Sequence, residues 1–155
     1  MVPEQANVPA YLIDTNILLR LSKRDDPLHA LVQSALDALV ERGSEICCTP
    51  QNISEFWNVC TRPADRNGFG LSVQETDQRL QVIERTITVL PDNERIYPEW
   101  RRLVVSHSVS GVQVHDARLA AAMHVHGVSH ILTLNLPDFA RCTSITAVRP
   151  ENVRV

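Results

Sequence analysis

The sequence has no long apolar run, no excess of positive charge and no cysteine or histidine spacing of the zinc-binding kind. A membrane-spanning helix needs about eighteen consecutive apolar residues, and no stretch approaches that length. The 15 basic and 18 acidic residues give a formal net charge of −3, whereas proteins that coat nucleic acid through bulk charge are usually basic. These absences predict a protein without a membrane span and argue against an architectural DNA-binding protein.

No two of the four cysteines form a C-x-x-C pair. We therefore expect free thiols, as in a reducing cytoplasm, rather than a zinc knuckle. Cys47 and Cys48 are neighbours in a predicted strand, so their side chains should point to opposite faces of the sheet. Residues 1–9 contain neither the basic region nor the apolar stretch of a secretory signal, and we expect an N-terminal arm in a cytoplasmic protein.

The 155 residues, 44% of them hydrophobic, suit a single globular domain with its own core. Short apolar segments alternate along the chain with segments of helical periodicity. We predict strands at 11–13, 46–49, 87–90, 130–134 and 146–148, and helices at 28–40, 50–60, from 72 onward, 98–107 and 116–125. This alternation indicates an α/β fold, a parallel sheet with helices on both faces, over residues 10–150, followed by a tail at 151–155.

Three aspartates follow predicted strands or open predicted helices. Asp14 comes directly after the first strand, Asp138 follows the strand at 130–134, and Asp116 opens the alanine-rich helix. In a parallel sheet, ligands bind beyond the carboxyl ends of the strands, so all three can face one edge. Clustered carboxylates repel each other unless a hard cation such as Mg²⁺ or Mn²⁺ binds them. Taken singly, each aspartate is better explained as a helix N-cap and Glu55 as a solvated side chain, so the case depends on the combination.

Four sequence blocks resemble the PIN-domain ribonucleases, and especially the VapC-type toxins of prokaryotic toxin–antitoxin modules. The blocks are Leu12-Ile-Asp-Thr-Asn-Ile-Leu-Leu, Ile53-Ser-Glu-Phe, His115-Asp-Ala-Arg-Leu-Ala and Leu132-Thr-Leu-Asn-Leu-Pro-Asp-Phe. Their order, spacing and flanking apolar residues agree with that family over about residues 10–150. The resemblance implies a five-stranded parallel sheet between helices and an endoribonuclease that depends on Mg²⁺ or Mn²⁺.

The resemblance also implies which residues form the site. Four acids are implied to bind the metal, namely Asp14, Glu55, Asp116 and Asp138. Small polar residues are implied to support them, namely Thr15, Asn16, Thr133 and Asn135. Many relatives carry an aspartate where Asn135 stands, so Asp138 is the fourth carboxylate here. We expect Asp14 and Asp116 to bind the main ion and the other two acids to complete its shell or to orient a water.

Partners follow from the same resemblance. Toxins of this type are usually neutralised by a small antitoxin and commonly form dimers, so we expect an antitoxin and a homodimer. The amphipathic helix at 28–40 and the helix that starts at Ser72 are candidates for these surfaces. For the RNA backbone, the candidate ligands are the side chains of Arg20, Arg62, Arg66, Arg118 and Arg141. Phe69 is expected to pack onto the domain, with stacking on an unpaired base as the alternative.

Three alternatives stay open. An aspartyl phosphatase needs a second aspartate two residues after the first, where this chain has Asn16, and a later lysine, whereas Lys23 is the only lysine. A catalytically silent PIN fold that serves as an interaction module would not need to keep four acids. A PIN nuclease outside toxin–antitoxin systems is the third alternative, because the loop at 61–72 resembles PIN proteins whose biological role is often unassigned.

Overall fold

The computed structural model describes residues 8–153, and these contain a five-stranded parallel sheet. Its strands are β1 (Tyr11–Ile13), β2 (Ile46–Cys48), β3 (Thr88–Val89), β4 (His130–Leu132) and β5 (Thr146–Val148). Their order across the sheet is β3-β2-β1-β4-β5. The chain thus builds outward from β1 in one direction and then returns to its other side. The gap beyond the ends of β1 and β4 is therefore the topological switch point, where α/β proteins bind ligands.

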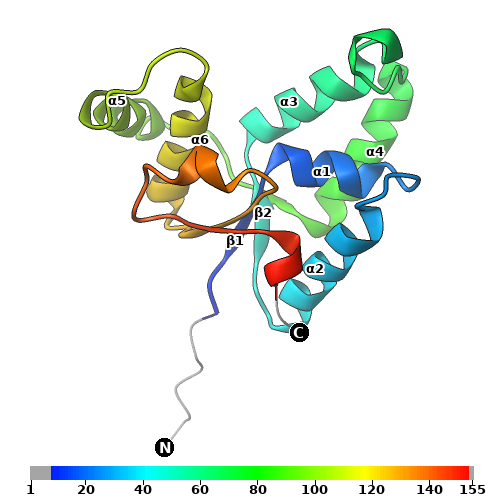
Figure 1. Cartoon of the computed structure of the whole chain (residues 1–155), viewed down its shortest axis with the longest axis horizontal. Coiled ribbons are helices and arrows are strands. Elements are labelled where there is room, and N and C mark those ends of the chain that lie inside the picture. The colour runs from blue at the N-terminus through cyan, green and yellow to red at the C-terminus, as the bar shows by residue number, and fades with distance from the viewer. Residues whose placement is uncertain (1–7, 154–155) are drawn as a thin grey trace, which may run out of the picture.

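Helices cover both faces of this sheet (Figure 1). They are α1 (Thr15–Ser22), α2 (His29–Glu41), α3 (Pro50–Thr61), α4 (Val73–Thr86), α5 (Ile96–Ser106) and α6 (Gln113–His126). Helices α1 to α4 enclose one apolar core, and α5 and α6 enclose the other. The α/β fold with one central parallel sheet, predicted from the alternation of segments, is confirmed.

Neighbouring strand residues divide between the two cores. Leu12 belongs to the core under α5 and α6, and Ile13 to the core under α1 to α4. Cys47 and Cys48 separate in the same way, which confirms that they point to opposite faces. Burial raises the pKa of both thiols to about 12. All four cysteines are free, as predicted, and these two are packing residues because a protonated, buried thiol is unreactive.

Helix starts follow local capping chemistry where the sequence provides it. Ser72 and Glu75 form the predicted capping box at α4, and Thr49 and Asn52 form a second one at α3, where Pro50 occupies the first helical position. Helix α5 begins two residues before Pro98, which lies in the first turn, where its missing N–H breaks no intrahelical hydrogen bond. The helix therefore tolerates this proline.

Most predicted boundaries differ from the observed ones by one to three residues, and two of these differences bear on the site. Helix α6 begins at Gln113, three residues earlier than expected, because a turn at Gly111, which has a positive φ of 63°, already directs the chain into the helix. Asp116 therefore lies inside the first turns of α6 and does not cap it. Strand β4 ends at Leu132 rather than 134, because beyond it the backbone N–H groups turn toward side chains of Asn16 and Thr133.

Short 3₁₀ helices connect the remaining segments, at η1 (Ala64–Arg66), η2 (Leu136–Phe139) and η3 (Pro150–Asn152). In residues 8–153, no helix is long and apolar enough to cross a membrane. Most of the predicted N-terminal arm (1–7) and the end of the predicted tail (154–155) lie outside the described residues. The predicted domain limits of 10 and 150 stay predictions.

A polar network joins α5, α6 and the loop before β5. Glu99 accepts hydrogen bonds from Arg102, and its Oε1 lies 3.0 Å from His124 Nδ1. The other ring nitrogen of His124 lies 2.7 Å from Ser144 Oγ. The hydrogen bond from Arg102 is the main cause that lowers the pKa of Glu99 to about 2, and His124 adds to it. This network ties the last turn of α6 to its neighbours, at the opposite end of that helix from Asp116.

Candidate active site

Asp14 lies at the topological switch point. Strand β1 ends at Ile13, and Asp14 is the N-cap of α1, where its Oδ1 accepts a hydrogen bond from the Thr15 N–H at 2.8 Å. Its Oδ2 accepts from Thr133 Oγ1 at 2.8 Å, because β4 runs beside β1 and ends at the same edge. The side chain is thus both a helix cap and a site residue, and the two interpretations are compatible. Only 9% of the residue is exposed.

Negative charge accumulates around Asp14. Burial raises its pKa above the ordinary value, and the charges of Glu55 and Asp138 add to this effect. The hydrogen bonds from Thr133 and Thr15 act in the opposite direction. Two carboxylates from distant parts of the sequence are therefore close enough to disfavour ionisation of a third.

Asp116 shows the same effect more clearly. Burial in the first turns of α6 is the largest cause that raises its pKa to about 6, followed by the charges of Asp138, Asp14 and Glu55. Asp116 and Asp138 also line one small hollow between α6 and η2. The structure therefore brings all four predicted acids together, although they come from four separate segments of the chain.

Glu55 is half-buried rather than solvated, contrary to the expectation for this residue taken alone. Its Oε2 accepts a hydrogen bond from Thr15 Oγ1 at 2.8 Å, because α1 packs against α3. Its Oε1 accepts from Gln51 Nε2 at 3.1 Å. Helical periodicity places Glu55 off the apolar face, but periodicity does not show that a second helix covers this side of α3.

The predicted supporting residues differ in how they contact the acids. Thr15 and Thr133 each donate directly to a carboxylate, as described above. Asn16 Nδ2 lies 3.5 Å from Asp14 Oδ2 and 3.4 Å from Thr133 Oγ1, and Asn16 Oδ1 accepts from the Leu134 N–H at 3.3 Å. Asn135 acts through its backbone, whose N–H donates to Thr133 Oγ1 at 3.0 Å, while its side chain is exposed.

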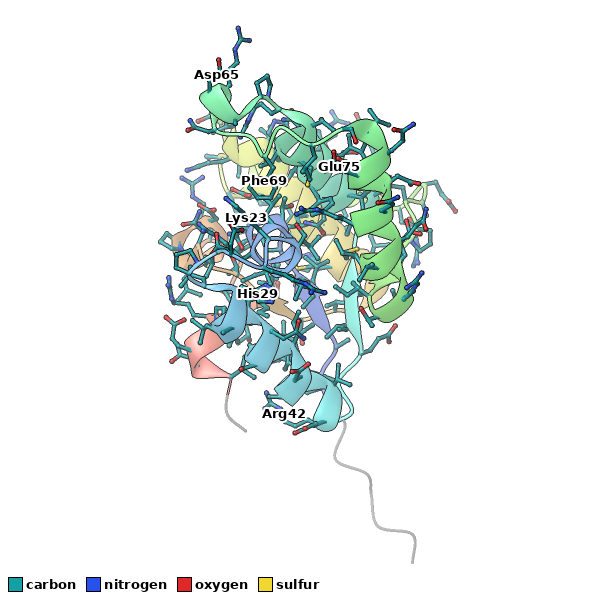
Figure 2. All side chains as sticks on the ribbon, turned by 90° about the vertical axis from the view of Figure 1, so that its right-hand side faces the viewer. Lys23, His29, Arg42, Asp65, Phe69 and Glu75 are labelled. Atoms are coloured by element: carbon teal, nitrogen blue, oxygen red, sulfur yellow. The ribbon has the colours of Figure 1, made fainter. Side chains whose placement is uncertain are left out.

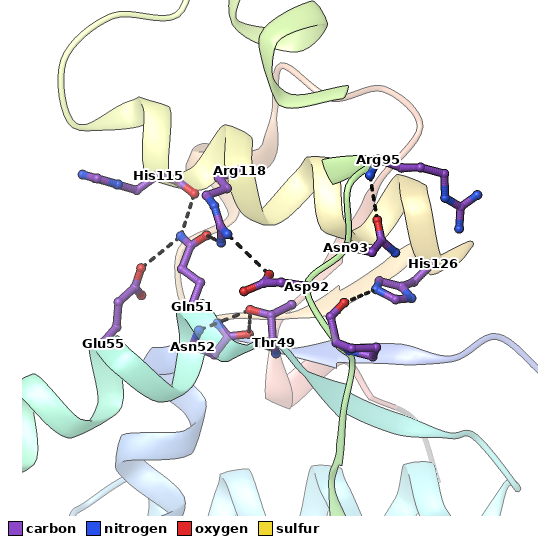
Figure 3. Close-up of polar contacts among 11 residues, drawn as sticks. Thr49, Gln51, Asn52, Glu55, Asp92, Asn93, Arg95, His115, Arg118 and His126 are labelled. Atoms are coloured by element: carbon purple, nitrogen blue, oxygen red, sulfur yellow. Dashed lines mark hydrogen bonds and ion pairs between the residues drawn. The ribbon is translucent and has the colours of Figure 1, made fainter. Parts of the chain in front are cut away.

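Sequence reasoning missed two residues of this site. Asn52 is fully buried, and its Nδ2 donates to Thr15 Oγ1 at 3.1 Å, which links the cap of α3 to the start of α1. The Thr49-x-x-Asn52 spacing of a capping box could have indicated it. Gln51 Nε2 donates both to Glu55 and to the His115 carbonyl oxygen, the latter at 2.8 Å (Figure 3). No sequence pattern predicts that contact, because its two partners lie 64 positions apart.

Comparison with known proteins assigns the fold to a family. The PIN domain family model matches residues 11–142 of this chain. The chain belongs to the PIN domain family. No curated protein matches the sequence significantly.

Solved structures of the same fold include several toxins and their complexes. This PIN domain resembles VapBC2 from Rickettsia felis bound to a DNA fragment from its promoter, with a TM-score of 0.68 and 12% identity over 90% of this chain and 98% of that one. A toxin–antitoxin complex from Klebsiella pneumoniae gives a TM-score of 0.63 and 21% identity, with coverages of 91% and 98%. VapC20 from Mycobacterium tuberculosis, described as a toxin that cleaves the sarcin–ricin loop, gives 0.64 and 15%, with coverages of 86% and 95%. Identities this low establish a shared fold.

Of the five candidate arginines, two lie beside the acids of the PIN domain. Arg141 lines the hollow that Asp116 and Asp138 share, and its side chain is exposed. Arg118 Nη1 donates to Gln51 Oε1 at 3.2 Å, and its Nη2 pairs with Asp92 at 3.4 Å.

The other three arginines lie elsewhere or have other partners. Arg20 pairs with Asp26 at 2.6 Å, and Arg62 donates to the Asn67 carbonyl within its own loop, which also carries the exposed Arg66. Phe69 packs against the core under α1 to α4, and Lys23 Nζ lies 5.1 Å from its ring centre (Figure 2). The prediction that Phe69 packs back onto the domain is confirmed.

The acids of this PIN domain do not form a closed cage. Across residues 8–153, no three Asp, Glu, His or Cys side chains converge on one point as a ready-made metal site. The carboxylates of Asp14 and Glu55 accept hydrogen bonds from threonine hydroxyl and glutamine amide groups. Asp138 is exposed. The arrangement is an open, acidic edge whose donor atoms are all carboxylate oxygens.

Proposed function

We propose that this PIN domain is a metal-dependent endoribonuclease that hydrolyses RNA phosphodiester bonds and acts as the toxin of a VapBC-type module. The observation that carries the proposal is the acid cluster at the switch point, where the pKa of Asp116 rises to about 6 and that of Asp14 also rises. Clustered like charges cost folding free energy, and such perturbed groups gather at functional sites. The toxin and toxin–antitoxin structures that share the fold support the biological part of the proposal.

The donor set fits a hard divalent cation. All four acids, namely Asp14, Glu55, Asp116 and Asp138, offer oxygen atoms, which Mg²⁺ and Mn²⁺ prefer. When bound there, such an ion would neutralise developing negative charge and lower the pKa of a bound water. Because no three of these groups already converge, we expect small side-chain rotations to complete the site, chiefly in the exposed Asp138.

The protein's own residues then have separate tasks. Thr133 and the Thr15 N–H hold the Asp14 carboxylate in one orientation, and Thr15 Oγ1 does the same for Glu55. Asp116 and Asp138 form one wall of the hollow in which Arg141 lies, and we assign to Arg141 the RNA phosphate next to the site. A side-chain nucleophile is not required, and the exposed His115 is not assigned as a base.

We further propose an antitoxin as partner, bound in the groove between α2 and α4. Apolar and charged side chains both line this groove, and its apolar residues Val40 and Val82 remain 55% and 59% exposed. Figure 2 faces this side of the molecule. An amphipathic helix of an antitoxin would bury these side chains, as helices do in the grooves of their partners. The homodimer stays a prediction, and we propose a cytoplasmic location because an RNA substrate and an antitoxin would both be present there.

RNA cleavage tests the nuclease. The purified protein is incubated with a pool of structured RNAs in Mg²⁺, in Mn²⁺ and in EDTA, alongside Asp14→Asn and the control Asp77→Asn, whose carboxylate lies on the exposed face of α4. We expect cuts by the wild type and the control in metal only, and none by Asp14→Asn. Full activity of folded Asp14→Asn contradicts the site assignment. Metal binding without cutting of any RNA, or no metal binding at all, favours the silent interaction module.

Growth tests the toxin role separately. Expression of the wild type in bacteria should arrest growth, and co-expression of a small protein encoded next to its gene should relieve the arrest. Val82→Asp, which places a charge in the α2–α4 groove, should keep the cleavage activity and lose the relief. RNA cleavage in vitro without growth arrest supports a PIN nuclease outside toxin–antitoxin systems.

A further inference from the structure

Gln51 connects the two helices that carry Glu55 and Asp116. It lies in the first turn of α3, and its side-chain nitrogen has two acceptors (Figure 3). One is Glu55 Oε1 at 3.1 Å, and the other is the carbonyl oxygen of His115 at 2.8 Å. His115 directly precedes Asp116 on α6, so both hydrogens of one amide group bridge the positions of two site acids.

Arg118 determines the orientation of this amide. Its Nη1 donates to Gln51 Oε1 at 3.2 Å, and its Nη2 pairs with Asp92 beyond β3 at 3.4 Å. A flipped amide would set its hydrogens against the guanidinium and its oxygen against the Glu55 carboxylate, so only one orientation satisfies every partner. The guanidinium of Arg118 is thus engaged with the protein itself, which argues against its predicted role as an RNA ligand.

The two helices have reason to separate when this bridge is absent. Helix α3 packs in the core under α1 to α4 and α6 in the other core, and their facing carboxylates repel each other. A neutral amide opposes this separation without adding charge. A lysine at the same place would neutralise part of the acid cluster, and a glutamate would add one more negative charge.

We propose that Gln51 is a positioning residue that, oriented by Arg118, holds Glu55 and Asp116 at the separation that divalent-metal binding requires. The inference rests on the function proposed above, since it assigns metal binding to those acids. Groups that hydrogen-bond to metal ligands commonly change metal affinity about tenfold or more when removed. Gln51 then determines the affinity of the site, while the four acids determine that a site exists.

Metal affinity tests this role without reference to RNA. Gln51→Leu removes the three hydrogen bonds at nearly constant volume, and its Mn²⁺ dissociation constant is measured by titration calorimetry. We expect the constant to rise about tenfold over the wild type. Gln81→Leu is the matched control, because Gln81 makes a 2.9 Å hydrogen bond to Asp77 with the same four-residue spacing, but on the exposed face of α4.

RNA cleavage across a Mn²⁺ series separates positioning from general damage. Gln51→Leu should lose about tenfold in rate at low Mn²⁺ and regain most of it at saturating Mn²⁺. Arg118→Met, which leaves Gln51 in place without its orienting bond, should raise the dissociation constant about threefold. This second variant keeps the test valid if Gln51→Leu folds poorly.

Two outcomes overturn the inference. One is a Mn²⁺ dissociation constant of Gln51→Leu equal to that of Gln81→Leu. The other is a loss of cleavage that saturating Mn²⁺ does not restore. A wild type that binds Mn²⁺ but cleaves no RNA contradicts the proposed nuclease instead, and the dissociation constants then still decide whether Gln51 positions the acids.

Discussion

Asp116 lies in the first turn of α6, and Glu99 contacts the last turn of the same helix through His124. The pKa values of these two acids are shifted in opposite directions. Asp116 faces other carboxylates, and burial together with their charge raises its pKa to about 6, although the N-terminal end of a helix favours negative charge. Glu99 faces Arg102 and His124, and its pKa falls to about 2. The paired acid stabilises the fold, whereas the clustered acids lower its stability. Acids that are kept at such a cost indicate chemistry rather than structure.

Activity should distinguish the two regions most strongly. Asp116→Asn should lower RNA cleavage by about a thousandfold or more, because a metal-binding carboxylate stabilises charge that develops in the transition state. Glu99→Gln should retain near wild-type cleavage, since its partners hold the far end of α6. Single-turnover rates on one RNA that the wild type cuts measure both effects. Equal losses in the two folded variants would contradict the distinction.

The second largest expected difference is in how much Mn²⁺ stabilises the two variants. With Mn²⁺ at about 100 times its dissociation constant, the free energy of unfolding of the wild type and of Glu99→Gln should rise by about 2.7 kcal/mol. Asp116→Asn should gain little, because it lacks one of the carboxylates that would hold the ion. Urea unfolding in Mn²⁺ and in EDTA measures the difference. A gain in Asp116→Asn as large as in the wild type would place the ion elsewhere.

In the absence of metal, the two substitutions should change the free energy of unfolding in opposite directions. In EDTA at pH 7, Asp116→Asn should unfold with a free energy about 1 kcal/mol higher than the wild type, because it removes a repelled charge that solvent partly screens. Glu99→Gln should lose about 1 kcal/mol or less, since its ion pair lies near the surface. Urea midpoints at equal m-values measure both changes. Destabilisation by Asp116→Asn would contradict the repulsion assigned to this carboxylate.

The pH dependence of stability should separate the two acids at the smallest scale. The folded-state pKa of Asp116 lies above its ordinary value of 3.8, so metal-free stability should fall as pH rises from about 4 to about 6, where the folded state binds more protons. The pKa of Glu99 is lowered from 4.5 to about 2, so its contribution is present above pH 4.5 and is lost as pH falls through that range. Urea unfolding of the wild type and the two variants from pH 3 to pH 7 measures these slopes. Each variant should lack its own slope and keep the other.

Much of the fold was predictable because the deciding interactions are local. Strand β5 lies where it was predicted, and β1 and α4 begin as expected, since apolar alternation and the Ser72 capping box act within a few residues. The predicted start of α6 was wrong by three residues, because the Gly111 turn sets it rather than a side-chain cap. Boundaries without a capping side chain carry little sequence signal.

In the candidate site too, local sequence patterns predicted some features and tertiary packing determined the others. The positions of Asp14, Asp116 and Asp138 near strand ends and helix starts were predictable from periodicity together with the rule that parallel strands end at one edge. The half-burial of Glu55 was not, because it depends on α1 packing against α3 across 40 positions. The engagement of Arg118 with Asp92 and Gln51 was equally hidden, since it depends on where β3 ends relative to α6.

By itself, the sequence determined most of the strands and helices, because propensity, periodicity and capping are properties of neighbouring residues, and its resemblance to the PIN family indicated the four acids. The tertiary structure alone decided how far apart those acids lie and which neutral groups hold them. Gln51 shows the reason, because its bond to the His115 carbonyl joins positions 64 apart and involves a backbone atom that every residue possesses. No pattern of side chains marks such a contact before the two helices have packed.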